Sequence, residues 1–330
     1  AVGSAAGLKT TTGTRNVAIG TSALLCNTTG SCNTAVGGMD NGTLSTMMCN
    51  TTGNKNTALG NSTLVKNTTA SDNTAVGALA LYANTTGAEN VAVGIGALDT
   101  NTVGTGNISI GCGSMSANVD GNYNVAIGRC ALDTSVSGSA NVAIGDRALY
   151  TNTASYNTSV GFFSLAANTT GANNAAVGTN ALSSNTTAAK NVAVGQNSLQ
   201  DNTTGAENTS VGYEALANNT TAGFNAAFGA NTLQTNTTGC QNAAFGMQSM
   251  NKNTTGNTNT AVGYIALTAN TTGANNAAVG SNSMGSNTTG SDNTAMGSQA
   301  LVSATTATTN TAFGRQAMCK TTTGAINTAV

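Results

Sequence analysis

Polar and apolar positions recur along this chain at every seventeenth residue. Each unit opens with asparagine, and residues 73–77 (NTAVG) show the pattern. With that asparagine counted as position 1, position 3 is Ala or Ser, position 4 is large and apolar, and position 5 is Gly. Position 9 is Leu or Met, and positions 12 to 15 mostly read NTTG. So short a period predicts a repeat architecture in which each unit stacks on its neighbours.

The spacing of glycines and turns favours strands over helices. Gly at position 5 and the NTTG turn lie too close together to leave room for stable helices. Two short apolar segments between such turns fit a coil with two strands. We therefore predict an all-β fold, a parallel β-solenoid (β-roll or β-helix) of about nineteen seventeen-residue coils. We expect residues 1–330 to form a single continuous domain.

The pattern also predicts which side chains point inward. Side chains alternate across a strand, so positions 2 and 4 point one way and position 3 points the other way. We expect the large residues at positions 4 and 9 to fill a thin interior. The small residues at position 3 then form a flat outer face that packs against another chain, as at Ala75, Ala126, Ser159 and Ala193.

Two coils depart from the period. The step from Asn33 to Asn56 exceeds the ordinary one by six residues, which predicts a loop insertion at about residues 38–46, around Asp40. The step from Asn141 to Asn157 is one residue short, and that coil lacks the turn glycine.

The two ends of the chain share the phase of the repeat. The chain begins at position 3 and stops at position 4, and residues 329–330 repeat residues 1–2. We expect from this that copies join end to end, or that the chain is a section of a longer fibre.

Composition narrows the classes of function. Only 6% of residues are charged, the formal net charge is -1, and histidine is absent. A nucleic-acid partner would require a basic surface, and histidine is the commonest general base and metal ligand. The acidic residues are scattered, without recurring pairs. We therefore expect no enzyme activity, no cofactor or metal, and no nucleic-acid partner. No apolar run approaches the roughly 20 residues that span a bilayer, so we expect no membrane insertion.

The asparagines at position 1 predict an internal ladder, in which each amide binds the next coil and the turn backbone. Stacked asparagine ladders stabilise cross-β structures. The ladder comprises Asn16, Asn33, Asn56, Asn73, Asn90, Asn107, Asn124, Asn141, Asn157, Asn174, Asn191, Asn208, Asn225, Asn242, Asn259, Asn276, Asn293, Asn310 and Asn327.

The asparagines at position 12 that begin NTT form N-glycosylation sequons on a predicted turn. The alternative is that NTTG is turn chemistry alone, because Asn tolerates left-handed conformation and Thr can stack in a ladder. The candidate glycan-bearing residues are Asn27, Asn50, Asn67, Asn84, Asn168, Asn185, Asn202, Asn219, Asn236, Asn253, Asn270 and Asn287.

Five of the seven cysteines lie at places where pairing is geometrically plausible. Cys26 and Cys49 occupy position 11 of consecutive coils, and Cys32 competes for Cys26 across the turn. Cys112 and Cys130 lie at positions 6 and 7 of consecutive coils. The alternative is that all seven are free thiols at variable surface positions, and an odd count leaves at least one unpaired.

The NVAIG units at residues 16–20 and 141–145 resemble the head repeats of trimeric autotransporter adhesins. The longer unit at residues 208–221 is similar to repeats of phage-type tail-fibre proteins and bacterial surface fibres. The resemblance implies a left-handed parallel β-roll and an extracellular fibre role.

Together these features predict a structural repeat protein that forms the rod of an extracellular or cell-surface fibre or filament. The rod is glycan-coated if the sequons are occupied. Its expected partners are copies of itself, end to end or side by side. The alternatives are an adhesin or phage-fibre binding module, and an ice-binding solenoid.

Overall fold

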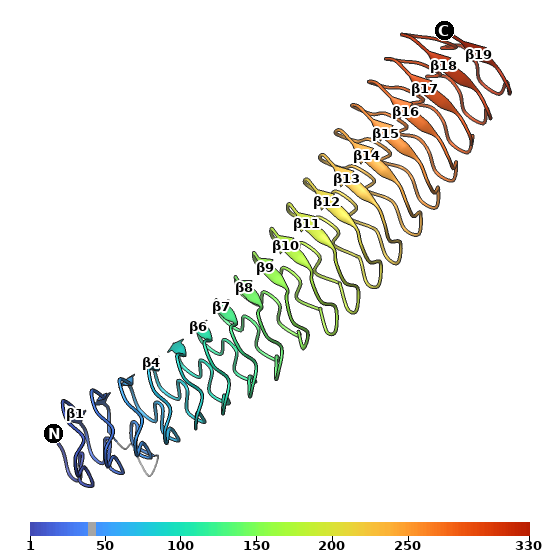
Figure 1. Cartoon of the computed structure of the whole chain (residues 1–330). Coiled ribbons are helices and arrows are strands. Elements are labelled where there is room, and N and C mark those ends of the chain that lie inside the picture. The colour runs from blue at the N-terminus through green and yellow to red at the C-terminus, as the bar shows by residue number, and fades with distance from the viewer. Residues whose placement is uncertain (39–43) are drawn as a thin grey trace. The chain divides into compact units, whose positions relative to one another are not determined.

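The computed structural model describes residues 1–38 and 44–330, and Figure 1 shows it with its strands labelled. The chain divides into two compact units, Ala1–Phe163 and Ser164–Val330. Each unit is a stack of coils that follow the period of the sequence, and consecutive strands pair in parallel. This confirms the predicted parallel β-solenoid. Whether residues 1–330 form one continuous domain stays a prediction.

The strands of the N-terminal unit pair in register, so that equal positions of successive coils face each other, as Val17 faces Thr34. An isolated parallel bridge joins Val2 to Ile19 ahead of them. The strands are β1 Val17–Ile19, β2 Thr34–Val36, β3 Thr57–Leu59, β4 Thr74–Val76, β5 Val91–Val93, β6 Ile108–Ile110, β7 Val125–Ile127, β8 Val142–Ile144 and β9 Thr158–Val160.

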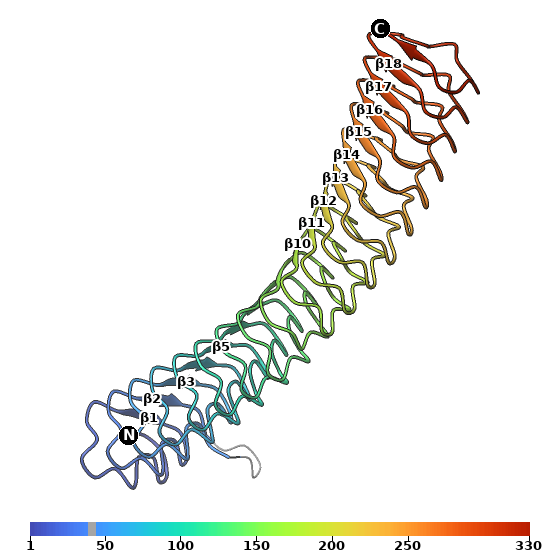
Figure 2. The ribbon, with the colours of Figure 1, turned by 45° about the vertical axis from the view of Figure 1, so that its right-hand side comes forward.

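The C-terminal unit repeats the arrangement, and in Figure 2 its strands follow one another along one side of the stack. Phe228 faces Phe245, for example, in the pairing of β13 with β14. The strands are β10 Ala175–Val177, β11 Val192–Val194, β12 Thr209–Val211, β13 Ala226–Phe228, β14 Ala243–Phe245, β15 Thr260–Val262, β16 Ala277–Val279, β17 Thr294–Met296, β18 Thr311–Phe313 and β19 Thr328–Ala329.

Each coil of the described residues contains one strand, so the prediction of two strands per coil is wrong. Positions 7, 9 and 17 adopt left-handed backbone, as at Asn197 (φ 56°), Leu199 (φ 54°) and Glu207 (φ 60°), and this conformation cannot continue a strand. It costs roughly 1–2 kcal/mol per non-glycine residue. Hydrogen bonds between coils offset this, because the N–H of Leu199 donates to the carbonyl of Ala215 at 2.9 Å.

The interior of the coil is a narrow slot. Position 3 faces position 8 across it, and the Ser109 hydroxyl donates to the carbonyl of Ser114 at 2.8 Å. Both positions hold small residues, and Leu or Met at position 9 fills the remaining space; Leu182 is fully buried. The inward assignment of position 9 is therefore confirmed.

The assignment of positions 3 and 4 is reversed in the structure. Ala75, Ala126, Ser159 and Ala193 are fully buried, so they form no outer face. The large residues of position 4 point outward, and Leu59 is 48% exposed. The physical reason is the width of the slot, because two opposed small side chains already fill it.

Glycine at position 5 is required where the coils approach most closely. Gly195 has φ +130°, and a Cβ atom on it would lie 2.4 Å from the carbonyl oxygen of Gly212 in the next coil. No side chain fits that distance.

Both irregular coils return to the phase of the stack. Of the predicted insertion, residues 39–43, including Asp40, lie outside the described residues. After it, Thr46 and Met47 are buried at positions 8 and 9. In the coil that is one residue short, the carbonyl of Ala154 accepts a 2.9 Å bond from the Asn141 amide, as the turn glycine does elsewhere.

Candidate interaction surface

The asparagines of position 1 form the predicted internal ladder. The backbone N–H of Asn191 donates to Oδ1 of Asn174 at 2.9 Å, and Oδ1 of Asn191 accepts from the N–H of Asn208 at 2.9 Å. Its Nδ2 donates to the carbonyl of Gly205 in the next turn at 3.0 Å. All members from Asn33 to Asn310 are buried, whereas the end members Asn16 and Asn327 are partly or largely exposed.

A second asparagine ladder runs through position 12. The Nδ2 atom of Asn253 donates to Oδ1 of Asn236 at 2.9 Å and to the carbonyl of Gly256 at 3.0 Å. The following threonines add a parallel row, because the hydroxyl of Thr254 donates to the carbonyl of Thr271 at 3.0 Å. Asn101 and Asn118 lack the sequon but occupy the same position and are equally buried. The requirement at position 12 is thus for the amide, not for the sequon.

The folded coil leaves no place for glycans on these asparagines. All twelve sequon asparagines named above have 0% exposure, and Nδ2 is the atom that would carry the sugar. A glycan there would remove an N–H that is donated inside the stack, and the buried site has no room for it. This burial favours the alternative of turn and ladder chemistry at position 12, and the occupancy of the sequons stays a prediction.

The position 12 ladder is interrupted once and ends before the last coils. Ser135 interrupts it, and after Asn287 position 12 holds Ala304 and then Thr321. Among the described residues, the buried Oδ1 atoms of Asn118 and Asn287 have no hydrogen-bond partner, and they face the coils of Ser135 and Ala304, respectively. The sequence shows where asparagine is replaced at position 12. It does not show that the replacement leaves a buried acceptor without a partner, because that depends on the geometry of the ladder.

All seven cysteines are free thiols in the structure, so the predicted disulfides are not formed. Cys26 and Cys49 stack at equal positions, where Cβ atoms are separated by about the 4.8 Å coil spacing. That separation exceeds the mean of about 3.8 Å in disulfides. Burial, followed by the neighbouring Cys26, raises the pKa of the Cys49 thiol.

The other two predicted partners, Cys112 and Cys130, differ in exposure. The N–H of Cys130 donates to the carbonyl of Cys112 at 3.1 Å, but Cys112 is exposed and Cys130 is half-buried. Burial, as the main cause, raises the pKa of the Cys130 thiol. Cys32 is exposed at position 17 and lines a shallow depression.

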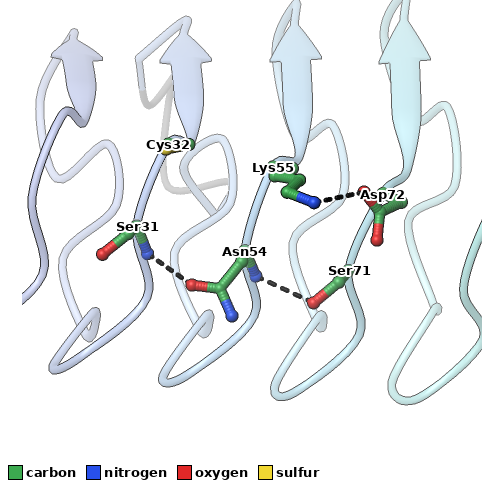
Figure 3. A pocket seen from close by; sticks show the side chains of 6 residues that line it. All are labelled: Ser31, Cys32, Asn54, Lys55, Ser71 and Asp72. Carbon is green, nitrogen blue, oxygen red and sulfur yellow. Dashed lines mark hydrogen bonds and ion pairs between the residues drawn. The ribbon is translucent and has the colours of Figure 1, made fainter.

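That depression lies over positions 16 and 17 of three consecutive coils (Figure 3). The N–H of Ser31 donates to Oδ1 of Asn54 at 2.8 Å, and the N–H of Asn54 donates to the Ser71 hydroxyl at 3.0 Å. An exposed ion pair of 3.9 Å joins Lys55 to Asp72, and such a pair contributes little to stability. These polar groups satisfy one another.

Two further kinds of site are not found in the described part of the chain. No group of three or more acidic or cysteine side chains there could hold a metal ion. Residues 1–38 and 44–330 also contain no helix with the length and apolar character of a membrane span.

Exposed apolar side chains recur along the outer face of the strands. We name it the β-face and define it as the side chains at positions 2 and 4. Its exposed members include Ile19 (43%), Leu59 (48%) and Phe245 (41%), and no strand of the described residues carries a charged residue. The rings of Phe228 and Phe245 stack at 4.9 Å with an interplanar angle of 4°. Because large exposed apolar surfaces are typical of interaction sites, the β-face is the candidate interaction surface.

Polar pairs flank the β-face at positions 6 and 17. Arg129 bonds Asp146 at 2.7 Å along position 6, and Lys190 bonds Glu207 at 3.1 Å along position 17. Opposite charges thus meet in consecutive coils, which leaves the flanks close to neutral.

No protein-family model matches the chain, and no curated protein matches it.

Proposed function

We propose that this protein is a structural element of an extracellular or cell-surface fibre, in which the stacked coils form the rod. The observation that carries the proposal is the pair of asparagine ladders running from coil to coil. In one coil, Asn191 and Asn202 each bind both a neighbouring asparagine and a turn carbonyl. These buried bonds join coils and serve no ligand.

The mechanical role follows from bonds that must break together. Separating two coils opens the strand ladder, the bonds of the left-handed residues and both asparagine rows at once. Buried hydrogen bonds are costly to leave unmade. An array of this kind therefore resists the loss of a single coil inside the stack, which suits a load-bearing element.

Electron micrographs of the purified protein, together with intact mass, test the proposal. We expect long fibres of uniform width whose subunit has the mass of the 32.2 kDa chain. Short discrete particles at every concentration would count against the fibre.

An adhesin is the second candidate, because aromatic side chains project beside the β-face. Tyr123 is 68% exposed, Tyr156 66% and Phe224 60%, all at position 17. Such rings suit contact with sugars or proteins. Binding to a glycan array that is lost in Tyr123→Ala and Tyr156→Ala, with the fold intact, would favour this candidate.

A further inference from the structure

We infer that the β-face of the C-terminal unit packs against the β-face of a second copy of this chain. The two stacks run parallel and are related by a two-fold axis along the stacking direction. The inference rests on the proposed structural role and names the surface that joins copies side by side.

The β-face of the C-terminal unit presents two rows. Position 2 holds Ala or Thr, with Val in one strand: Ala175, Val192, Thr209, Ala226, Ala243, Thr260, Ala277, Thr294 and Thr311. Position 4 holds Val, Met or Phe: Val177, Val194, Val211, Phe228, Phe245, Val262, Val279, Met296 and Phe313. In the six strands where Ala lies beside Val or Phe, or Thr beside Met or Phe, the surface is a groove beside a ridge. In β11, β12 and β15 the two rows have similar size.

Groove and ridge compensate each other within single strands. The strands β13 and β14 both read Ala-Ala-Phe, so the bulky Phe228 and Phe245 lie beside the small Ala226 and Ala243. A strand that faces only solvent does not need a small side chain beside a large one. Two copies of the same strand that pack against each other do need this arrangement, because close packing requires that a large side chain on one copy meet a small one on the other.

The symmetry of the pairing follows from the order of the rows. A two-fold axis along the stack reverses the strand direction and keeps the height of each coil. It therefore places position 4 of one copy against position 2 of the other, so that Phe245 covers the partner copy's Ala243. A two-fold axis along the strands would instead place ridge on ridge. Only the first arrangement fills the groove.

The strands set the area of the face. Ten strands at about 4.8 Å, each about three residues long at about 3.3 Å, give roughly 500 Å² per copy. The pair then buries on the order of 1,000 Å², the lower limit for a specific interface. Positions 2 and 4 are uncharged in every strand of the unit, so burial of these two rows leaves no charge unpaired.

Sedimentation equilibrium of the full chain tests the pairing. We expect the unchanged protein to sediment as dimers or as larger assemblies of dimers, and we expect Ala243→Lys and Phe245→Glu each to weaken the pairing by about tenfold or more. The control is Thr255→Lys, at exposed position 14 of the same coil, which should associate like the unchanged protein. Circular dichroism of each variant confirms that the coils are folded.

Mixing the two variants tests the two-fold axis. Lys at 243 of one copy then faces Glu at 245 of the other, so the mixture should associate again, whereas neither variant does so alone. A folded protein that stays monomeric at all concentrations, or face variants that match the control, would overturn the inference. A mixture that fails to recover would overturn the arrangement of the two copies. Micrographs of the same samples keep this result separate from the proposed fibre: dimers without fibres would contradict only the fibre.

Discussion

Ala304 occupies the ladder place from which an asparagine would donate to Oδ1 of Asn287, and it leaves that buried oxygen without a partner among the described residues. A buried acceptor left unmade costs roughly 1–3 kcal/mol. We expect Ala304→Asn to raise the free energy of unfolding by about 1 kcal/mol, measured by denaturant titration. The control is Ala300→Asn, which buries an amide at position 8 away from the ladder and should destabilise. Equal destabilisation by both would mean that position 304 cannot accept the amide.

Two glycines of one coil separate the effect of close approach from that of backbone conformation. A Cβ atom on Gly94 (φ +137°) would lie 2.6 Å from the carbonyl oxygen of Gly111, whereas one on Gly96 (φ +62°) would meet no atom within 4 Å. We expect Gly96→Ala to cost about 1 kcal/mol, the penalty of left-handed backbone alone. Gly94→Ala should cost several times more in thermal and denaturant unfolding. Similar losses would mean that the coils can move apart at Gly94.

The period, the fold class, the position 1 ladder and the buried position 9 all follow from the sequence, because each depends on strict recurrence. The outward direction of position 4 does not follow from the sequence, because its large apolar side chains favour a prediction of burial. A cue was present: position 4 varies from Val36 to Phe228 and Met296, which a slot of fixed width could not accept. Positions 3 and 8 are both restricted to small residues, as opposed walls require.

The predicted outer face of small side chains at position 3 is wrong for the same reason. The β-face exists because the slot between positions 3 and 8 is too narrow for the side chains at position 4, such as Phe245. That width depends on the left-handed residues at positions 7, 9 and 17. Residues such as Leu199 and Glu207 rarely adopt left-handed backbone, so residue propensities do not predict this conformation at these positions. The sequence alone leaves the sequons ambiguous, because buried ladder amides and glycan acceptors share one motif.

A matched pair in one coil tests the reversal. Leu64 at position 9 is fully buried, and Leu59 at position 4, outside the proposed dimer face, is 48% exposed. We expect Leu64→Asp to unfold the local coils and lower the melting temperature sharply, because it buries an unpaired charge. Leu59→Asp should leave the melting temperature within a few degrees, since ordinary surface substitutions change stability by about 0.5 kcal/mol or less. An equal fall in melting temperature for both variants would mean that the position 4 side chain is buried.

The burial of the sequons predicts bare asparagines in folded protein. Asn236 and Asn253 donate Nδ2 hydrogen bonds inside the stack, and a sugar on either nitrogen would displace the neighbouring coil. We expect intact mass after secretion from a glycosylating host to be unchanged by enzymatic deglycosylation at all twelve sequons. Peptide mapping of the folded fraction checks each site. Glycans on these asparagines in folded fibres would contradict the burial of position 12 inside the coil.

Asp99 gives the stack a pH dependence of definite sign. Burial, followed by the neighbouring charge of Asp133, raises the pKa of the Asp99 carboxyl, although the N–H groups of Asp99 and Thr100 oppose the rise. Its buried Oδ1 has no partner among the described residues. Because the folded state holds this proton more tightly than the unfolded chain, stability falls as pH rises from the ordinary carboxyl pKa, about 3.9, through the raised value. Below that range both states are protonated, and the penalty is absent.

Replacing the carboxyl removes the titration. We expect Asp99→Asn to melt at a higher temperature than the unchanged protein at pH 7, because the amide stays neutral in the buried site. The two should converge near pH 3, where the Asp99 carboxyl is protonated in both states. Thermal melts followed by circular dichroism across this range measure the difference. A gain that did not change with pH would show that the amide acts through a new hydrogen bond and not through the loss of the charge.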